Sequence, residues 1–225
     1  MPARRPSLFL ALGVGVGLAL ATSAGAQVII QTFTIPSGTS VPFSQNFTFN
    51  TFNPALGILG NVTLSLSTSI TAEIDIFNAN ATPQPFTNAT ATIPVTLTGP
   101  GSATVLATAI AGPVSGTASP GLNAFPGLPA SASTTVNVLP TNWGFYENPP
   151  SGITGTLNVS AAGGNYNGTP IPGVFFGGSA TAGATVTLEY DYSTAIPEPG
   201  ATAFLTAGAL GGLGLALRRR KQSNV

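Results

Sequence analysis

Alternating apolar and polar residues dominate the middle of the chain. In "NVTLSLSTSITAEIDIF", residues 61–77, most even positions from Val62 to Ile76 are Val, Leu or Ile, whereas the odd positions carry Thr, Ser, Glu or Asp. A period of two over this length predicts one long β-strand, or two strands in phase, with one buried face and one wet face. The segment "ATVTLEYDYS" repeats the pattern, and its predicted inward side chains are Val186, Leu188, Tyr190 and Tyr192.

Shorter alternations and turn-forming segments divide the rest of the body. The alternations are Ile93-Val95-Leu97, Val136-Val138 and Ile153-Leu157-Val159. The Gly- and Pro-rich segments between them predict turns or loops at 53–60, 98–102, 119–129, 147–152 and 161–173. Many strands joined by such turns predict an all-β fold, a single antiparallel β-sandwich or jelly roll over residues 27–195.

The N-terminal segment has the order of parts typical of a secretory signal peptide. Arg4 and Arg5 precede an apolar run from Leu8 to Ala21, and small residues follow up to Ala26. This order predicts a signal peptide over residues 1–26, cleaved between Ala26 and Gln27. The alternative is an N-terminal membrane anchor, but the apolar run is shorter than the roughly 20 residues that span a bilayer.

The C-terminal segment, residues 196–225, combines a proline-rich motif, an apolar run and a basic end. Pro197 and Pro199 fix φ and lack a backbone donor, so residues 196–199 of the motif segment 196–200 are expected to be extended and to expose Glu198. The uncharged run 201–217 predicts a transmembrane helix. The tail 218–225 is predicted to be cytoplasmic by the positive-inside rule, because it begins with Arg218, Arg219, Arg220 and Lys221.

This order of parts resembles the PEP-CTERM sorting signal of Gram-negative bacteria. The residues that carry the resemblance are Pro197, Glu198 and Pro199, the apolar run, and the basic stop from Arg218 to Lys221. The resemblance implies an exosortase substrate that is held transiently in the membrane, cut near the motif and passed to the cell surface or the exopolysaccharide matrix. The alternative interpretation is a rigid linker before an ordinary, retained membrane anchor.

The distribution of charge excludes several classes of function. All six basic residues lie in the two terminal segments, and the chain has no His and no Cys. A body without cations cannot neutralise phosphates, so no nucleic-acid partner is expected. Ser-His-Asp, Cys-His, Ser-Lys and histidine-ligated zinc sites are excluded together, which leaves only a two-carboxylate glycosidase formally open. The sequence therefore predicts a protein that is not an enzyme and that needs no cofactor.

Two carboxylate pairs are weak candidates for a metal site. Glu73 and Asp75 lie two positions apart on one predicted strand, and Glu189 and Asp191 do so on another. Ca²⁺ prefers oxygen ligands, so paired carboxylates on a strand face can attract it. The alternative is that these acids occupy the solvent-facing side of two amphipathic strands.

The segment "NWGFYENPP" contains the only Trp of the chain. Trp143, Phe145 and Tyr146 lie close together in a turn-rich stretch, beside a carboxylate and Asn side chains. Aromatic faces next to polar groups can form a sugar-binding platform. The alternative is that the three rings plug the end of the sandwich.

Together these features predict a non-enzymatic, exported protein of the cell envelope or exopolysaccharide matrix. Its expected partners are exosortase, the membrane during sorting, and exopolysaccharide. The second hypothesis is a carbohydrate-binding or adhesive surface module that uses the Trp143 region.

Overall fold

The computed structural model describes residues 25–147, 154–169 and 171–194. Its strands are β1 Ala26–Ser40, β2 Phe43–Asn50, β3 Ile58–Asn78, β4 Gln84–Thr98, β5 Thr104–Ala118, β6 Gly121–Asn137, β7 Thr154–Ala161, β8 Asn165–Asn167 and β9 Val174–Ser193. Short 3₁₀ helices connect some of them, namely η1 Pro54–Leu56, η2 Pro100–Ser102 and η3 Pro140–Phe145. Each of these helices has Pro at its first position, where a missing N–H costs no hydrogen bond.

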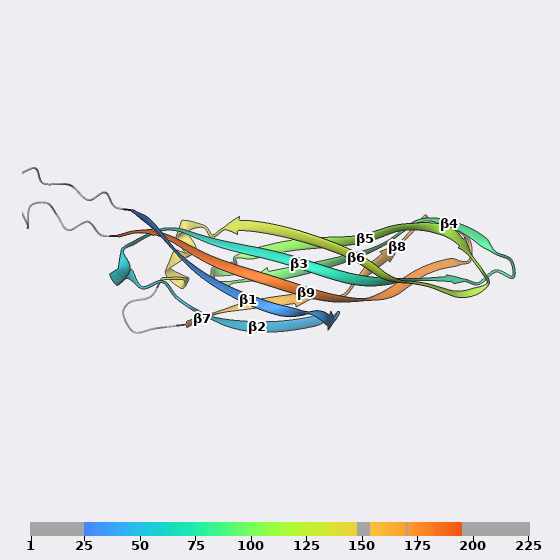
Figure 1. Cartoon of the computed structure of the whole chain (residues 1–225), viewed down its shortest axis with the longest axis horizontal. Coiled ribbons are helices and arrows are strands. Elements are labelled where there is room, and N and C mark those ends of the chain that lie inside the picture. The colour runs from blue at the N-terminus through green and yellow to red at the C-terminus, as the bar shows by residue number, and fades with distance from the viewer. Residues whose placement is uncertain (1–24, 148–153, 170, 195–225) are drawn as a thin grey trace, which may run out of the picture. The chain divides into compact units, whose positions relative to one another are not determined.

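The strands form two antiparallel sheets that face each other across a common core. Sheet A has the order β1-β9-β3-β6, and sheet B has the order β2-β7-β4-β5 with β8 paired to β4. The strands of both sheets lie roughly along one common axis (Figure 1). This arrangement confirms the predicted all-β class and is consistent with the predicted sandwich. None of the helices in the described ranges is long and apolar enough to cross a bilayer, and the predicted span 201–217 lies outside those ranges.

The alternation predicted over residues 61–77 is one continuous strand, β3, and its phase is confirmed. The even positions Val62, Leu64, Leu66, Ile74 and Ile76 are completely buried. Its partner β9 follows the same rule, with Val186, Leu188 and Tyr190 buried and Tyr192 packed against the core. Each of these strands has a neighbour on both sides. Packing against the core therefore decides which face of the strand carries apolar side chains.

One polar residue interrupts the buried row of β3. Thr68 is 2% exposed, and its hydroxyl donates to the carbonyl of Gly183 on β9 at 2.9 Å. The hydrogen bond satisfies a group that would be costly to bury alone. The buried row of β3 therefore continues through Thr68, although the polarity of this residue alone would predict an exposed position.

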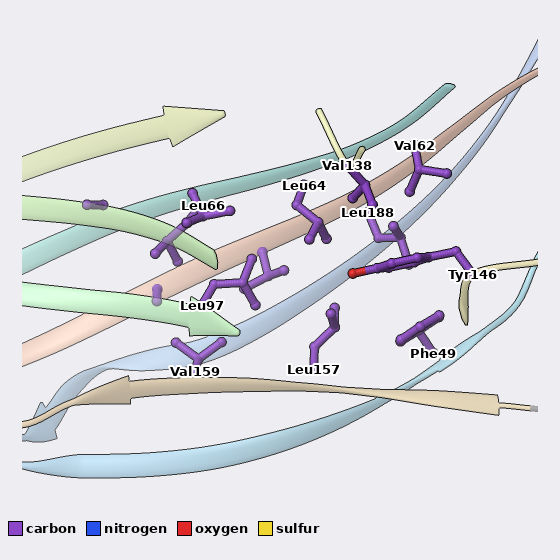
Figure 2. Close-up of a cluster of buried hydrophobic side chains, with 14 of the residues drawn as sticks. Phe49, Val62, Leu64, Leu66, Leu97, Val138, Tyr146, Leu157, Val159 and Leu188 are labelled. Carbon is purple, nitrogen blue, oxygen red and sulfur yellow. The ribbon is translucent and has the colours of Figure 1, made fainter. Parts of the chain in front are cut away.

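The core is filled from both sheets and by Tyr146, the residue that follows the helix η3. Figure 2 shows the ring of Tyr146 between side chains that come from both sheets, including Leu64, Leu157 and Leu188. Tyr146 stacks on Phe49 with ring centroids 5.6 Å apart, and its hydroxyl donates to the carbonyl of Pro100 at 3.2 Å. Burial raises the pKa of its phenol to about 12.

The edge strands of sheet A depart from a simple period of two. In β6, the even positions of 128–137 point inward, but before them Phe125, at an odd position, points inward and packs on Phe86 with ring centroids 5.4 Å apart. The register with β3 shifts at this point, and Gly127 has a φ of 74° that favours glycine. Pro126 and Gly127 thus form a bulge that reverses the phase of the strand.

This bulge overturns one sequence-based prediction. Residues 119–129 were expected to form a loop because of their Gly and Pro, whereas residues 121–129 belong to β6. Proline is tolerated here because β6 lies at an edge and has only one ladder to satisfy. The predicted loop 161–173 likewise contains the short strand β8.

Candidate functional site

The two ends of the described chain meet at one end of sheet A. Ala26 pairs with Ser193 and Gln27 pairs with Tyr192. The predicted cleavage between Ala26 and Gln27 therefore falls within the first pairs of the ladder between β1 and β9. The sorting motif Pro197, Glu198 and Pro199 lies outside the described residues, as does the basic stop from Arg218 to Lys221. We call this end of the sandwich the chain-end pole (Figure 1).

The aromatic residues of the predicted glycan platform do not form one exposed surface. Tyr146 is completely buried, so its assignment to a platform is corrected: the ring is part of the core. Trp143 packs against the same core, and its indole N–H donates to the carbonyl of Val138 at 3.0 Å. Only Phe145, 57% exposed, is open to solvent. The arrangement matches the alternative in which the aromatic residues close the end of the sandwich.

The two carboxylate pairs lie on the same face of sheet A but at opposite ends of β3. Glu189 pairs with Thr63, whereas Ser179 pairs with Glu73. The ten positions between Thr63 and Glu73 correspond to roughly 33 Å at about 3.3 Å per residue. Glu73 and Asp75 therefore cannot share a cation with Glu189 and Asp191. No group of three or more His, Cys, Asp or Glu side chains suited to a metal occurs among the described residues.

The outer face of sheet A carries a groove lined by hydroxyl groups. Three adjoining hollows follow β3 and β9 between the edge strands, and the largest has a volume of about 490 Å³. We define the hydroxyl groove by the side chains Ser37, Ser67, Ser69, Thr71, Ser131 and Thr181. They come from four strands, because each strand of the sheet directs its polar positions to this face.

The shape of the groove follows from a bulge and a glycine. The register between β1 and β9 shifts between Ile35 and Thr39, so the Pro36–Gly38 segment leaves the plane of the sheet. Its backbone then passes over Gly183 of β9, where a Cβ atom would meet the Cα of Ser37 at 2.9 Å. The bulge thus forms one wall of the groove, and only glycine leaves room for it.

The hydroxyl groups near the chain-end pole differ from those of the groove. Near the pole Ser65 and Thr135 hydrogen bond to each other at 2.8 Å, and Thr63 donates to Asn137 at 3.1 Å. Within the described part of the chain, no such partner is found for the groove side chains Ser69, Thr71 and Thr181. The groove therefore presents donors and acceptors that the fold itself does not use.

Beyond the groove the same face continues to an apolar patch. Phe77 on β3 pairs with Phe175 on β9 and with Leu122 on β6, and the side chains are 47%, 61% and 67% exposed. The two rings lie 6.4 Å apart between centroids, at an interplanar angle of 33°. We call Phe77, Phe175 and Leu122 the distal patch. At the chain-end pole, Ile58 of β3 pairs with Ser193. The strand from Ile58 to Phe77 rises about 3.3 Å per residue, so the distal patch lies roughly 60 Å from the pole.

Glu73 and Asp75 lie between the groove and the distal patch. Asp75 pairs with Gly177, which leaves open space because nothing lies within 4 Å of where its Cβ would be. One carboxylate oxygen of Asp75, Oδ1, is buried and has no hydrogen-bond partner within the described ranges. Burial, together with the nearby charge of Asp75, raises the pKa of Tyr166. The body contains no Lys, Arg or His that could balance these carboxylates.

The groove and the distal patch were not predicted as sites. The pairing of Phe77 with Phe175 joins strands that are far apart in the sequence, which no local pattern reveals. A signal was nevertheless present for Phe77. It occupies an odd position of the alternation 61–77, and all the other odd positions of that segment are polar. An exposed ring at this position follows from the pattern alone.

Comparison with known proteins identifies no family for the chain. No family model matches it, and no curated protein matches it. Among solved structures, one match is titled "Structure of infectious bursal disease virus Gx strain", with 15% identity over 96% of this chain and 54% of that chain, and a TM-score of 0.20. The corresponding Gt strain structure gives 14% identity over 95% and 53%, and a TM-score of 0.16. The chain spans about half the length of these viral chains, and such TM-scores support no shared fold or function.

Proposed function

We propose that the protein is a non-enzymatic, exported component of the cell envelope or exopolysaccharide matrix. In this proposal, residues 1–26 are a signal peptide, residues 201–217 form a transient transmembrane helix, and exosortase cuts the chain near Pro197-Glu198-Pro199. The cleaved body then remains at the outer surface or in the matrix.

The pairing of Ala26 with Ser193 is the observation that supports this proposal most directly. Both terminal segments are directed to the same membrane in this proposal, so a domain whose two ends lie together fits it without a long linker. The neighbouring strands β1 and β9 begin and end at the chain-end pole, so both segments can reach one membrane without opening the sandwich. Cleavage after Ala26 leaves Gln27 paired with Tyr192, so the sheet keeps its edge strand.

The surface of the sandwich also supports a role in a hydrated matrix. The outer faces of both sheets carry Ser, Thr and Asn, as in the rows Asn46-Asn158-Thr98 of sheet B and Thr187-Ser65-Thr135 of sheet A. Such side chains keep the folded domain in contact with water, in a chain with only 5% charged residues.

The chemistry of the body supports a role without catalysis. It has no His, Cys, Lys or Arg to serve as nucleophile or general base. The pairs Glu73–Asp75 and Glu189–Asp191 lie at opposite ends of the ladder between β3 and β9, and Asp191 accepts a hydrogen bond from the Asn61 side chain at 3.4 Å.

Epitope tags test this function in a host that has exosortase. One tag follows Gln27 and a second follows Val225. We expect the mature surface protein to keep the first tag and to lose the second. Replacement of Pro197, Glu198 and Pro199 by alanine should trap the full-length chain in the membrane, because the span and its orientation do not depend on those residues.

A matched control replaces three other residues of the C-terminal segment. Alanine at Gln222, Ser223 and Asn224 leaves the motif, the apolar run and the basic stop intact, so processing should continue as in the wild type. If the wild type and both variants retain the C-terminal tag, the sorting proposal is wrong and a permanent anchor replaces it.

A further inference from the structure

We infer that the outer face of sheet A, from the hydroxyl groove to the distal patch, binds a chain of an uncharged polysaccharide. The inference rests on the proposed function for the presence of polysaccharide around the protein, but its site follows from the geometry alone. It places the sugar-binding surface on β3 and β9 and not at Trp143.

The distal patch supplies an apolar surface where the fold does not need one. Phe77 and Phe175 occupy the wet face of the two central strands, and their rings stay about half exposed or more. Contiguous exposed apolar residues, unlike singly scattered ones, are a feature of binding surfaces. The carbon-bound hydrogens of a pyranose ring form an apolar face, and aromatic rings present a matching flat surface. Stacked sugar rings are therefore ligands of the right shape for this pair.

The groove supplies hydrogen bonds in line with the patch. Successive rows on the face are spaced by about 6.7 Å along a strand and by about 4.8 Å between strands. The hydroxyl groups of Ser69, Thr71 and Thr181 can donate to and accept from the hydroxyl groups of a sugar. A polymer fits better than a single sugar, because the groove and the patch together extend over several rows of the sheet.

The carboxylates between the groove and the patch indicate that the ligand is uncharged. Glu73 and Asp75 accept hydrogen bonds from hydroxyl donors, and such charged acceptors form stronger bonds than neutral ones. Asp75 Oδ1 is buried and lacks a partner within the described ranges, and the residue paired with Asp75, Gly177, has open space where a Cβ would lie. The same carboxylates repel acidic polymers, and the body offers no cation to offset that repulsion. An uncharged polysaccharide satisfies all of these conditions.

Binding of the full-length chain to immobilised polysaccharides tests this inference. The probes are three uncharged polymers, namely dextran, galactomannan and cellulose, together with the acidic polymer alginate. We expect binding to at least one uncharged polymer and none to alginate. The Phe77→Ala/Phe175→Ala double variant should bind at least tenfold more weakly. Phe145→Ala is the matched control, because it removes a similarly exposed ring at the chain-end pole and should leave binding unchanged.

Thermal unfolding of each variant shows whether a loss of binding reflects a loss of fold. If the double variant unfolds early, Asp75→Asn serves in its place, and it should weaken binding without affecting the apolar patch.

The inference is overturned if the wild type binds none of the uncharged polymers, or if the protein binds equally after removal of both rings. It is also overturned if the distal patch proves to be a contact between two copies, which size-exclusion chromatography with light scattering detects as a dimer lost in the double variant. A protein that is processed normally but binds no polysaccharide contradicts this inference and leaves the proposed function intact.

Discussion

The central strands of sheet A, β3 and β9, differ from its edge strands, β1 and β6, in how regularly their side chains alternate. The β3–β9 ladder has continuous register from Asn61 to Asn78, opposite Asp191 to Val174. Each edge strand instead contains a bulge with proline and glycine, at Pro36–Gly38 in β1 and at Pro126-Gly127 in β6. A strand with two neighbours must satisfy two ladders, whereas an edge strand has one ladder and can bend.

The difference has a consequence for the surface of the protein. Bulges and prolines at an edge discourage pairing with strands of other chains, which would otherwise add to an open sheet. In β1 the bulge also forms a wall of the hydroxyl groove over Gly183. The regular central strands β3 and β9 thus provide a flat face, and the bulge in the edge strand β1 forms a wall beside it.

The largest expected effect is that of a charge placed on the inner face of a central strand. Ile74 is completely buried on β3, so Ile74→Asp should unfold the protein or lower its free energy of unfolding by several kcal/mol. Ser67→Asp is the matched control on the same strand, because Ser67 lies on the outer face and its replacement should cost little. Urea denaturation measures both, and equal losses of stability would contradict the phase of β3.

High pH is expected to have the next largest effect, through the phenols that fill the core. Burial raises the pKa of Tyr146 to about 12, and burial together with the nearby Tyr146 raises that of Tyr190. In the unfolded chain both groups ionise near their ordinary pKa of about 10. Between about pH 10 and 12 the unfolded chain therefore releases protons that the folded chain keeps, and the free energy of unfolding should fall as the pH rises.

Urea denaturation at a series of pH values checks this expectation. The free energy of unfolding should not respond to Tyr146 below pH 10 and should decline above it. Tyr146→Phe removes one of the buried phenols, so its decline should be shallower, although loss of the bond to Pro100 costs about 1 kcal/mol at neutral pH. The same decline in the wild type and the variant would show that Tyr146 is not buried as described.

A pair of glycine substitutions separates edge from centre with a smaller effect. Gly127 in the β6 bulge has a φ of 74°, whereas Gly177 in β9 is not in the left-handed region, and both have open space where a Cβ would lie. Gly127→Ala should therefore cost about 1 kcal/mol. Gly177→Ala should be neutral or stabilise by up to about 1 kcal/mol, because it restricts the unfolded chain. If calorimetry finds that Gly177→Ala is the more damaging change, the contrast between edge and centre is wrong.

The same contrast explains which parts of the fold could be predicted from the sequence. The alternations in β3 and β9, and the shorter ones at Ile93-Val95-Leu97 and Leu157-Val159, are confirmed because packing on the inner face fixes every second residue. Ile153, which begins the last predicted alternation, lies outside the described residues. Residues 121–129 were misread as a loop, since Pro126 and Gly127 are common in turns and only the neighbour β3 shows that they form a bulge.

The candidate site was less accessible to sequence reasoning than the fold. The cluster at Trp143 was noticed because its aromatic residues are adjacent in the sequence, yet Tyr146 belongs to the core. The distal patch was missed because it depends on the register between β3 and β9, which sets Phe77 beside Phe175. Local composition identifies unusual residues, but the pairing of strands decides which of them share a surface.

Top-down mass spectrometry of the protein extracted from the cell surface tests the central claim, export with loss of both terminal segments, most directly. We expect a chain that begins at Gln27 and ends before Ala201, and that therefore contains none of the six basic residues. A chain that still includes residues 201–225, with Arg218, Arg219, Arg220 and Lys221, would contradict loss of the C-terminal segment and would identify that segment as a permanent anchor.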